Sequence, residues 1–199
     1  GGGIPAKNYL HALERAMGCS LRLQKETRSI FTREPVLVTA YEDTAFYAMS
    51  AVAAKAQEKS AANGDNFSLF TLDSGNYHIC LSDGMGSGAA ASKESEMVVD
   101  LIEKLVEAGF PRETAIRMMN SAMVLKGDNE SYSTLDFAGI DLYTGELALT
   151  KIGAAASFIR TRKDVRCLSQ SSLPAGVDTD QVPEPQNEKL GNGDFLVMV

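Results

Sequence analysis

The chain has 199 residues, 44% of them hydrophobic, which predicts a globular protein with one sizeable domain as the default. Nineteen lysines and arginines against 26 aspartates and glutamates give a formal charge of −7, the wrong sign for binding a nucleic acid backbone. No apolar run approaches the roughly 18 residues of a membrane helix, and the N-terminus lacks a signal-peptide pattern. Three scattered cysteines without a C-x-x-C pair predict neither a disulfide framework nor a zinc site, which is typical of the cytoplasm.

The first predicted element is a short amphipathic helix over residues 6–17, which Gly18 ends. Strands are predicted over 36–38 and 46–49, although the alanines at 51–56 leave a helix open as the alternative. The polar stretch 57–64 is predicted to be a loop.

A hairpin follows, with strands over 67–70 and 77–81 joined by a turn at 73–76. Beyond a glycine-rich stretch, a long helix carries an apolar stripe over 97–106, and a second helix is predicted over 112–125. The remaining strands are predicted over 134–142, 147–152, 157–161, 165–168 and 195–199. Hairpin-linked strands with two adjacent helices between them predict antiparallel sheets with segregated helices, which is an α+β fold.

The stretch LSDGMGSG, residues 81–88, places Asp83 at the end of an apolar strand, where an unpaired charge is costly to bury. A phosphate-cradling loop is one interpretation, but Gly84, Gly86 and Gly88 give G-x-G-x-G and not G-x-G-x-x-G, and no G-K-[ST] follows. The other interpretation is a metal site, because a hard divalent cation binds carboxylates and main-chain carbonyls such as that of Gly84.

Asp65 and Asp136 are candidate co-ligands of Asp83. Asp65 starts the strand that is expected to pair with the Asp83 strand, and Asp136 lies inside a strand that is apolar on both faces. A carboxylate at position 136 needs a cation, a network of donors or a raised pKa. Each aspartate alone could equally be a cap, a turn residue or an acceptor for backbone amides. The three together favour a metal site and leave the ion and the reaction open.

These residues resemble the stage II sporulation protein E phosphatases, a bacterial branch of the metal-dependent type 2C serine/threonine phosphatases. The motifs that carry the resemblance are N-G-D-N (63–66), L-S-D-G-M-G-S-G (81–88), S-T-L-D (133–136), I-D-L-Y-T-G (140–145), S-L-P-A-G (172–176) and G-D-F-L-V-M-V (193–199). The resemblance implies a phosphatase domain over 36–199, preceded by an N-terminal helical and regulatory segment over 1–35. The implied fold is a four-layer α-β-β-α sandwich with two central antiparallel sheets.

By that similarity, two magnesium or manganese ions would lie at one edge of the sandwich. Asp83 would bridge both ions, the Gly84 carbonyl would bind one, and Asp65 and Asp136 would complete the visible shell. A bridging metal-bound water would attack phosphoserine in line, so the three aspartates would be the catalytic residues. In the family a further Asp-Gly ligand follows the strand that matches 195–199, so we expect the domain to be C-terminally incomplete at Val199.

The resemblance implies a phosphorylated protein substrate, an anti-anti-sigma factor in sporulation or stress sigma-factor control. It also implies a cytoplasmic domain, with an upstream membrane anchor and a homodimer both left open. A catalytically silent phosphatase fold that serves as a binding module is the alternative function, and the intact Asp65, Asp83 and Asp136 favour the enzyme. An ATP-binding anti-sigma kinase would need glycine in place of Met85 to form D-x-G-x-G.

Overall fold

The computed structural model describes residues 3–24, 27–32, 34–54, 64–86, 88–126, 132–177 and 182–199. The chain divides into two compact units, Gly1–Ala45 and Phe46–Val199. The first unit extends past the predicted boundary at residue 35 because β4 (Ala40–Glu42) pairs with β2 (Leu21–Leu23). The loop predicted over 57–64 lies, except for Gly64, outside the described residues.

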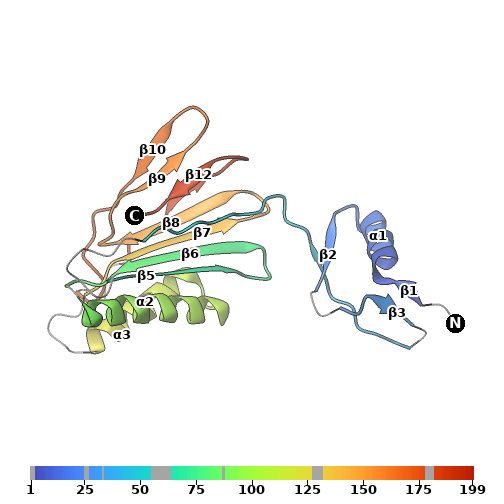
Figure 1. Cartoon of the computed structure of the whole chain (residues 1–199), viewed down its shortest axis with the longest axis horizontal. Helices are drawn as coiled ribbons and strands as arrows, with labels where there is room; N and C mark the ends of the chain where they lie inside the picture. The colour runs from blue at the N-terminus through green and yellow to red at the C-terminus, as the bar shows by residue number, and fades with distance from the viewer. Residues whose placement is uncertain are drawn as a thin grey trace. The chain divides into compact units, whose positions relative to one another are not determined.

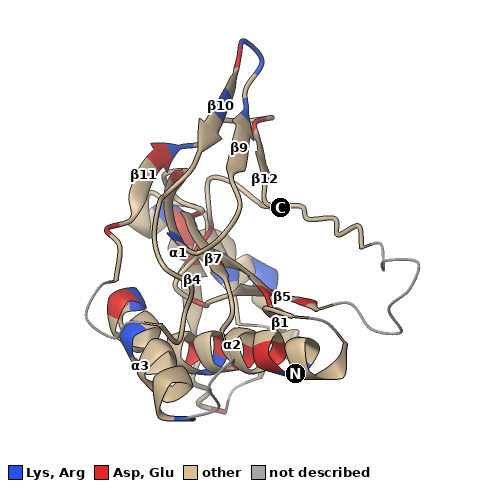
Figure 2. Cartoon of the chain, turned by 90° about the vertical axis from the view of Figure 1, so that its left-hand side faces the viewer, with Lys and Arg blue, Asp and Glu red and all other residues tan. Residues whose placement is uncertain are grey.

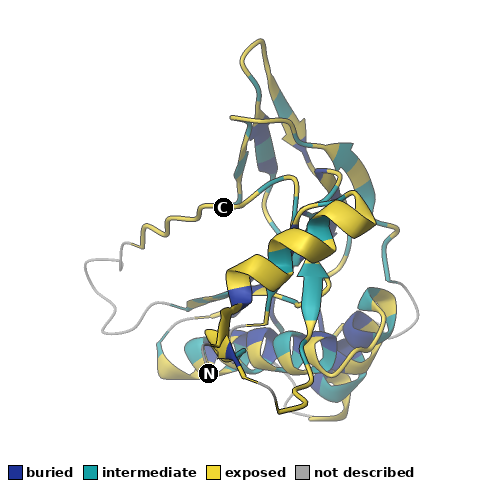
Figure 3. Cartoon of the chain, turned by 90° about the vertical axis from the view of Figure 1, so that its right-hand side faces the viewer, coloured by how far each residue is buried: buried dark blue, intermediate teal, exposed yellow. Residues whose placement is uncertain are grey.

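The first unit contains helix α1 (Ala6–Met17) and two antiparallel strand pairs, β2 with β4 and β1 (Ile4–Pro5) with β3 (Ile30–Phe31). The helix has the predicted bounds, and Gly18 ends it in the left-handed conformation with φ of 73°. Most of the helix is exposed, and Ala6 is its buried residue (Figure 3). The strand predictions over 36–38 and 46–49 were wrong, since neither range within the described segment 34–54 forms a strand.

The second unit is built on a five-stranded antiparallel sheet of order β11-β8-β7-β6-β5. Its strands are β5 (Asp65–Thr71), β6 (Asn76–Asp83), β7 (Leu135–Asp141), β8 (Glu146–Ile152) and β11 (Gln186–Lys189). The predicted hairpin is therefore confirmed as β5 and β6. The edge strand β11 was missed, because its sequence QNEK shows no apolar alternation.

Both faces of this sheet are covered (Figure 1). Helices α2 and α3 lie on one face, and the three-stranded sheet β10-β9-β12 lies on the other. Their bounds are α2 (Ala89–Glu107), α3 (Arg112–Leu125), β9 (Ser157–Arg160), β10 (Val165–Leu168) and β12 (Phe195–Val197). Along β7, Leu135 and Phe137 pack against the helices, whereas Ala138 and Ile140 join the core between the sheets. The described residues thus supply a helix layer and two sheet layers of the expected α+β sandwich.

The turn of the β9–β10 hairpin is charged. The exposed turn between β9 and β10 carries Arg162, Lys163 and Asp164 at the tip of the hairpin (Figure 2). In the part of the chain that the structure describes, no helix has the length and the apolar character needed to cross a membrane.

His78 lies on the helix-covered face of β6 between two aromatic rings. Its ring centroid is 5.0 Å from that of Phe70 and 5.5 Å from that of Phe137, and both pairs are stacked. The guanidinium of Arg112 lies 4.6 Å from the Phe137 centroid. Burial, followed by the charge of Arg112, lowers the pKa of His78 from 6.5 to about 4. His78 is therefore a neutral residue of the core near pH 7.

This burial predicts a loss of stability in acid. The unfolded chain protonates His78 below pH 6.5 and the folded chain only near pH 4, so the free energy of unfolding should fall as the pH drops through that window. The difference between the two pKa values corresponds to about 3 kcal/mol. Urea unfolding across this range should show a smaller loss for His78→Phe than for the wild type. His11→Gln, in the exposed part of α1, is the control, and equal losses in all three proteins would contradict the prediction.

Candidate active site

Asp65 and Asp83 lie directly opposite each other at one end of the five-stranded sheet. Asp65 begins β5, Asp83 ends β6, and the antiparallel register pairs them. Directly opposed residues of antiparallel strands project from the same face. Tyr77 and Ile79, which alternate in step with Asp83 along β6, pack into the core between the two sheets. The two carboxylates therefore lie on the inner face of the sandwich, at its rim.

The electrostatics of this pair suit a divalent cation. Burial raises the pKa of Asp83, and the hydrogen bond and charge of Asp65 raise it further. Two carboxylates that face each other disfavour each other's ionised form, and a dication between them would remove that repulsion. Carboxylate and carbonyl oxygens are also the ligands that hard divalent cations prefer. The donor set at this rim fits manganese or magnesium.

Gly84, the next residue, is buried under the first turn of α2. A Cβ atom at this position would lie 1.9 Å from the carbonyl oxygen of Ala91 in that helix, so only glycine fits. Its N–H donates to the Gly64 carbonyl at 3.1 Å. By contrast, a Cβ atom at Gly86 or Gly88 would meet no described residue other than its chain neighbours within 4 Å, and these glycines have positive φ angles of 110° and 80°. The glycines of the loop thus serve two different needs, helix contact and backbone conformation.

Ser95 and Asn66 fasten the start of β5 to α2. The Ser95 hydroxyl donates to the carbonyl of Gly64, and the Asn66 amide donates to Ser95 Oγ and to the Ser92 carbonyl, both at 2.8 Å. Asp65 lies between these anchored neighbours. Ser95 was not predicted, although its spacing of three and seven residues before Val98 and Ile102 places it on the buried face of the helix.

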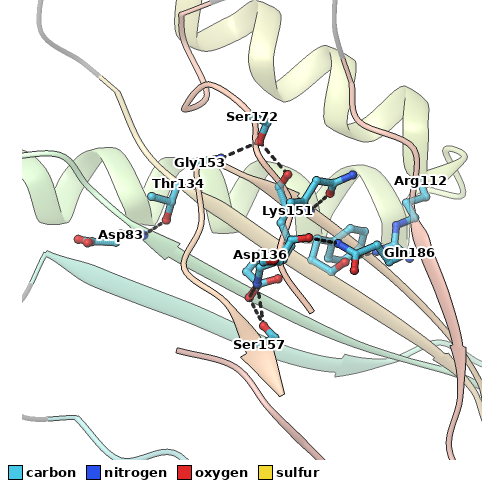
Figure 4. Close-up of polar contacts among 12 residues, drawn as sticks. Asp83, Arg112, Thr134, Asp136, Lys151, Gly153, Ser157, Ser172 and Gln186 are labelled. Carbon is cyan, nitrogen blue, oxygen red and sulfur yellow. Dashed lines mark hydrogen bonds and ion pairs between the residues drawn. The ribbon is translucent and has the colours of Figure 1, made fainter. Parts of the chain in front are cut away.

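The first residues of the S-T-L-D motif hold the main chain of Asp83. Thr134 N–H donates to the Asp83 carbonyl at 2.8 Å, and Asp83 N–H donates to Thr134 Oγ1 at 2.9 Å (Figure 4). The Ser133 hydroxyl donates to the same carbonyl at 2.8 Å. Ser82 Oγ lies 2.7 Å from Ser133 Oγ and completes the network. These bonds fix the direction in which the Asp83 carboxylate leaves the strand.

Asp136 projects from the same face but lies deeper between the sheets. Its partner across β6 is Leu81, and its own exposure is 1%. Lys151 Nζ and the Ser157 hydroxyl both donate to its Oδ2, the latter at 2.7 Å (Figure 4). Burial raises the pKa of Asp136, and the hydrogen bonds from Lys151 and Ser157 oppose that shift. The chain itself thus supplies the cation and the donors that a buried carboxylate needs.

The structure therefore groups Asp65, Asp83 and Gly84 and holds Asp136 apart. Within the described ranges, no three side chains of His, Cys, Asp or Glu converge on a common point that could hold a metal ion. The metal-ligand role of Asp136 stays a prediction. Its Oδ1 is the atom it would offer, since this buried oxygen has no hydrogen-bond partner among the described residues. Lys151 was not predicted, although a lysine next to Ile152 in a strand with three apolar residues at 147–149 was a visible signal.

Comparison with known proteins decides the family. The family model for Stage II sporulation protein E (SpoIIE) matches residues 73–199. The chain is 36% identical over 161 residues to Stage II sporulation protein E of Bacillus subtilis (strain 168) and 33% identical over 155 residues to that of Priestia megaterium. The chain belongs to the SpoIIE family. These matches cover 80% and 78% of the chain but only 20% and 26% of the two relatives, so the chain spans a fifth to a quarter of their length.

Solved structures confirm the fold. The PP2C phosphatase domain of SpoIIE from Bacillus subtilis, determined with a fragment of the regulatory domain, is 30% identical with a TM-score of 0.73. That match covers 98% of this chain and 59% of the other. RsbX in complex with magnesium is 21% identical with a TM-score of 0.57, covers 69% and 65% of the two chains, and shows the shared fold alone. This SpoIIE-family chain therefore has the type 2C phosphatase fold predicted from its motifs.

Proposed function

We propose that this SpoIIE-family chain is a metal-dependent serine/threonine phosphatase that hydrolyses phosphoserine on a protein. The observation that carries the proposal is the apposition of Asp65 and Asp83 beside buried Gly84, at the rim of a PP2C-type sandwich. An anti-anti-sigma factor in sporulation or stress control is the substrate class that the family resemblance suggests. The names of the two sporulation relatives support that setting.

Divalent manganese or magnesium would be held by Asp83, Asp65 and the main-chain carbonyl of Gly84. RsbX, a protein of the same fold, was solved in complex with magnesium, which supports a divalent cation as the ligand class, whereas the ligand residues are proposed from the geometry of this chain. Bound ions would supply Lewis acidity toward phosphoryl oxygens and toward water. The chain's own contribution is to bind the ions with two opposed carboxylates and to hold those carboxylates still.

Preorganisation of the carboxylates comes from their neighbours. Ser133 and Thr134 orient Asp83 through its main chain, while Ser95 anchors the residue that precedes Asp65. A site held in this way need not reorganise when charge develops on a phosphoryl group.

Thiolate or histidine catalysis is not supported at this rim. Cys80 lies within the helix-covered core, and burial raises the pKa of its thiol. His78 lies on the same helix-covered face of β6, whereas Asp83 lies on the opposite face. The proposed chemistry therefore depends on the carboxylates and the ions that they bind.

The test is manganese-dependent release of phosphate from a phosphoserine protein. We expect release with manganese, none with a chelator in excess, and much less from a phosphotyrosine substrate. The silent-module alternative predicts binding of the phosphoprotein without release at any manganese concentration. That result would reject the phosphatase proposal.

We further propose that the first unit, residues 1–45, is regulatory. The apolar face of α1 leaves Leu13 and Met17 exposed at 40% and 66% within this unit, which favours a role in contacts outside it. Deleting residues 1–45 should change the turnover rate or the oligomeric state while manganese affinity stays within about threefold, because all the proposed ligands lie in the second unit. An insoluble second unit, or one that no longer binds manganese, would instead assign the segment to the core.

The cytoplasmic location, the upstream membrane anchor and the homodimer stay predictions. They rest on the resemblance to relatives of which the aligned region is only a fifth to a quarter. Light scattering of the purified chain would test the homodimer.

A further inference from the structure

A cluster of charged and polar side chains is buried between the two sheets, deeper than Asp65 and Asp83. Lys151 and Ser157 are 0% exposed and Asp136 is 1% exposed. Lys151 Nζ donates to Asp136 Oδ2 and, at 2.7 Å, to Ser157 Oγ. Asp136 and Lys151 lie opposite each other on β7 and β8, whereas Ser157 begins β9 of the three-stranded sheet. The cluster therefore ties one sheet to the other (Figure 4).

Lys151 is also fixed through its main chain. Its N–H donates to Gln170 Oε1 at 3.1 Å, and its carbonyl accepts from the Ser172 hydroxyl at 3.0 Å. Ser172 Oγ in turn accepts from the N–H of Gly153 at 3.0 Å. Hydrogen bonds thus hold both the main chain of Lys151 and its ammonium group. The ammonium group therefore contacts Asp136 from a fixed position.

The cluster connects to Asp83 through residues 133–136, which lead into and begin β7. Asp136 is two residues from Thr134, whose hydroxyl and N–H both bond the main chain of Asp83. Residues 133–136 therefore make two sets of contacts, one to Asp83 and one to the buried cluster. If Asp136 moved along or across the sheet, the main chain of residues 134–136 would move with it. Thr134 would then displace the main chain of Asp83.

Stability alone does not explain a buried ion pair. Desolvation of two charges is costly, and apolar residues of similar volume often give equal or greater stability at such positions. Breaking the pair, by contrast, leaves one uncompensated charge in the core. An ion pair is therefore suited to enforcing one arrangement of the strands that carry it.

We propose that Lys151 is a positioning residue which, with Asp136 and Ser157, sets the Asp83 carboxylate against Asp65. This inference rests on the phosphatase function proposed above and adds to it the residues that shape the metal site. Lys151 touches neither the ions nor the substrate and acts through Asp136 and Thr134.

The test compares three variants in the full chain, with manganese as the probe. Ser157→Ala removes the link to the second sheet, Lys151→Met breaks the ion pair, and the double variant Lys151→Met with Asp136→Leu replaces it by apolar groups. Calorimetry measures manganese affinity, and hydrolysis of p-nitrophenyl phosphate measures kcat/KM. The melting temperature shows whether each variant is folded. Thr150→Val is the matched control, a buried polar residue next to Lys151 on β8.

We expect Ser157→Ala and the double variant to melt as folded proteins and to bind manganese at least about tenfold more weakly than the wild type, with kcat/KM reduced to match. Thr150→Val should keep wild-type affinity. Lys151→Met should melt at a markedly lower temperature, because Asp136 loses its countercharge. Where that variant fails to fold, Ser157→Ala carries the test, because it leaves both Asp136 and Lys151 in place.

Two results would overturn the positioning role. If the double variant bound manganese and turned over substrate as the wild type does, the cluster would contribute to stability only. Equal or tighter manganese binding by Ser157→Ala would indicate that Asp136, once released, is itself a ligand. Failure of the phosphatase proposal looks different, because the wild type itself would then bind no manganese or release no phosphate.

Discussion

Asp83→Asn is expected to abolish phosphatase activity while leaving the fold intact. The substitution keeps the shape of the side chain but removes the charge that divalent ions need, and Asp65 alone is a poor site for a dication. We expect kcat/KM to fall on the order of a thousandfold, about 4 kcal/mol in the barrier. Phosphate release with saturating manganese measures the loss of kcat/KM, and circular dichroism shows whether the fold is retained.

The same substitution should stabilise the metal-free chain slightly. Like charges directly opposed on antiparallel strands are destabilising by about 0.2–1 kcal/mol, and Asn removes one of them. Asp100→Asn, which alters an exposed carboxylate on α2, is the matched control and should leave activity unchanged. Activity of Asp83→Asn within about tenfold of wild type would show that Asp83 does not hold the ions.

Gly84→Ala is expected to have the second large effect. The new Cβ would lie 1.9 Å from a main-chain oxygen of α2, and no side-chain rotation relieves a clash with backbone. Either α2 or the Asp83–Gly84 peptide must move, so stability should fall by about 3 kcal/mol. Manganese affinity should fall with it, since the Gly84 carbonyl is a proposed ligand. Thermal melting and calorimetry separate the two losses.

Gly86→Ala is the matched control for this glycine. Its φ of 110° makes alanine strained, but no described residue other than its chain neighbours lies within 4 Å of the new Cβ, so a loss of about 1–2 kcal/mol is expected. Equal losses for the two variants would mean that contact with α2 is not what requires glycine at position 84.

The helices and the central hairpin were predictable because their signals are local. The bounds of α1 and α3 follow from apolar spacing and end signals, and the β5–β6 hairpin follows from two alternating runs around a turn. The short strands of the first unit were not predictable, because pairs of two or three residues carry no periodicity. The polar strand β11 depends on its partner β8 and not on its own sequence.

The candidate site was likewise predictable only where its signals are local. Asp65 and Asp83 flank one hairpin, so its symmetry brings them together. Asp136 comes from the next strand, where its neighbour depends on register, and the register places it opposite Leu81 and not Asp83. Its partner Lys151 depends on a second register, and Ser157 on the stacking of two sheets. No pattern within one strand contains that information.

The edge strand β11 bears on how copies of this protein meet. Its four residues are all polar, and Arg166 of β10 forms an ion pair with Glu188. A second chain that extended the sheet at this edge would have to desolvate Glu188 and Lys189 along its length, which is how natural sheets resist fibre-like growth. Self-association of the second unit should therefore leave this border of the sheet in water.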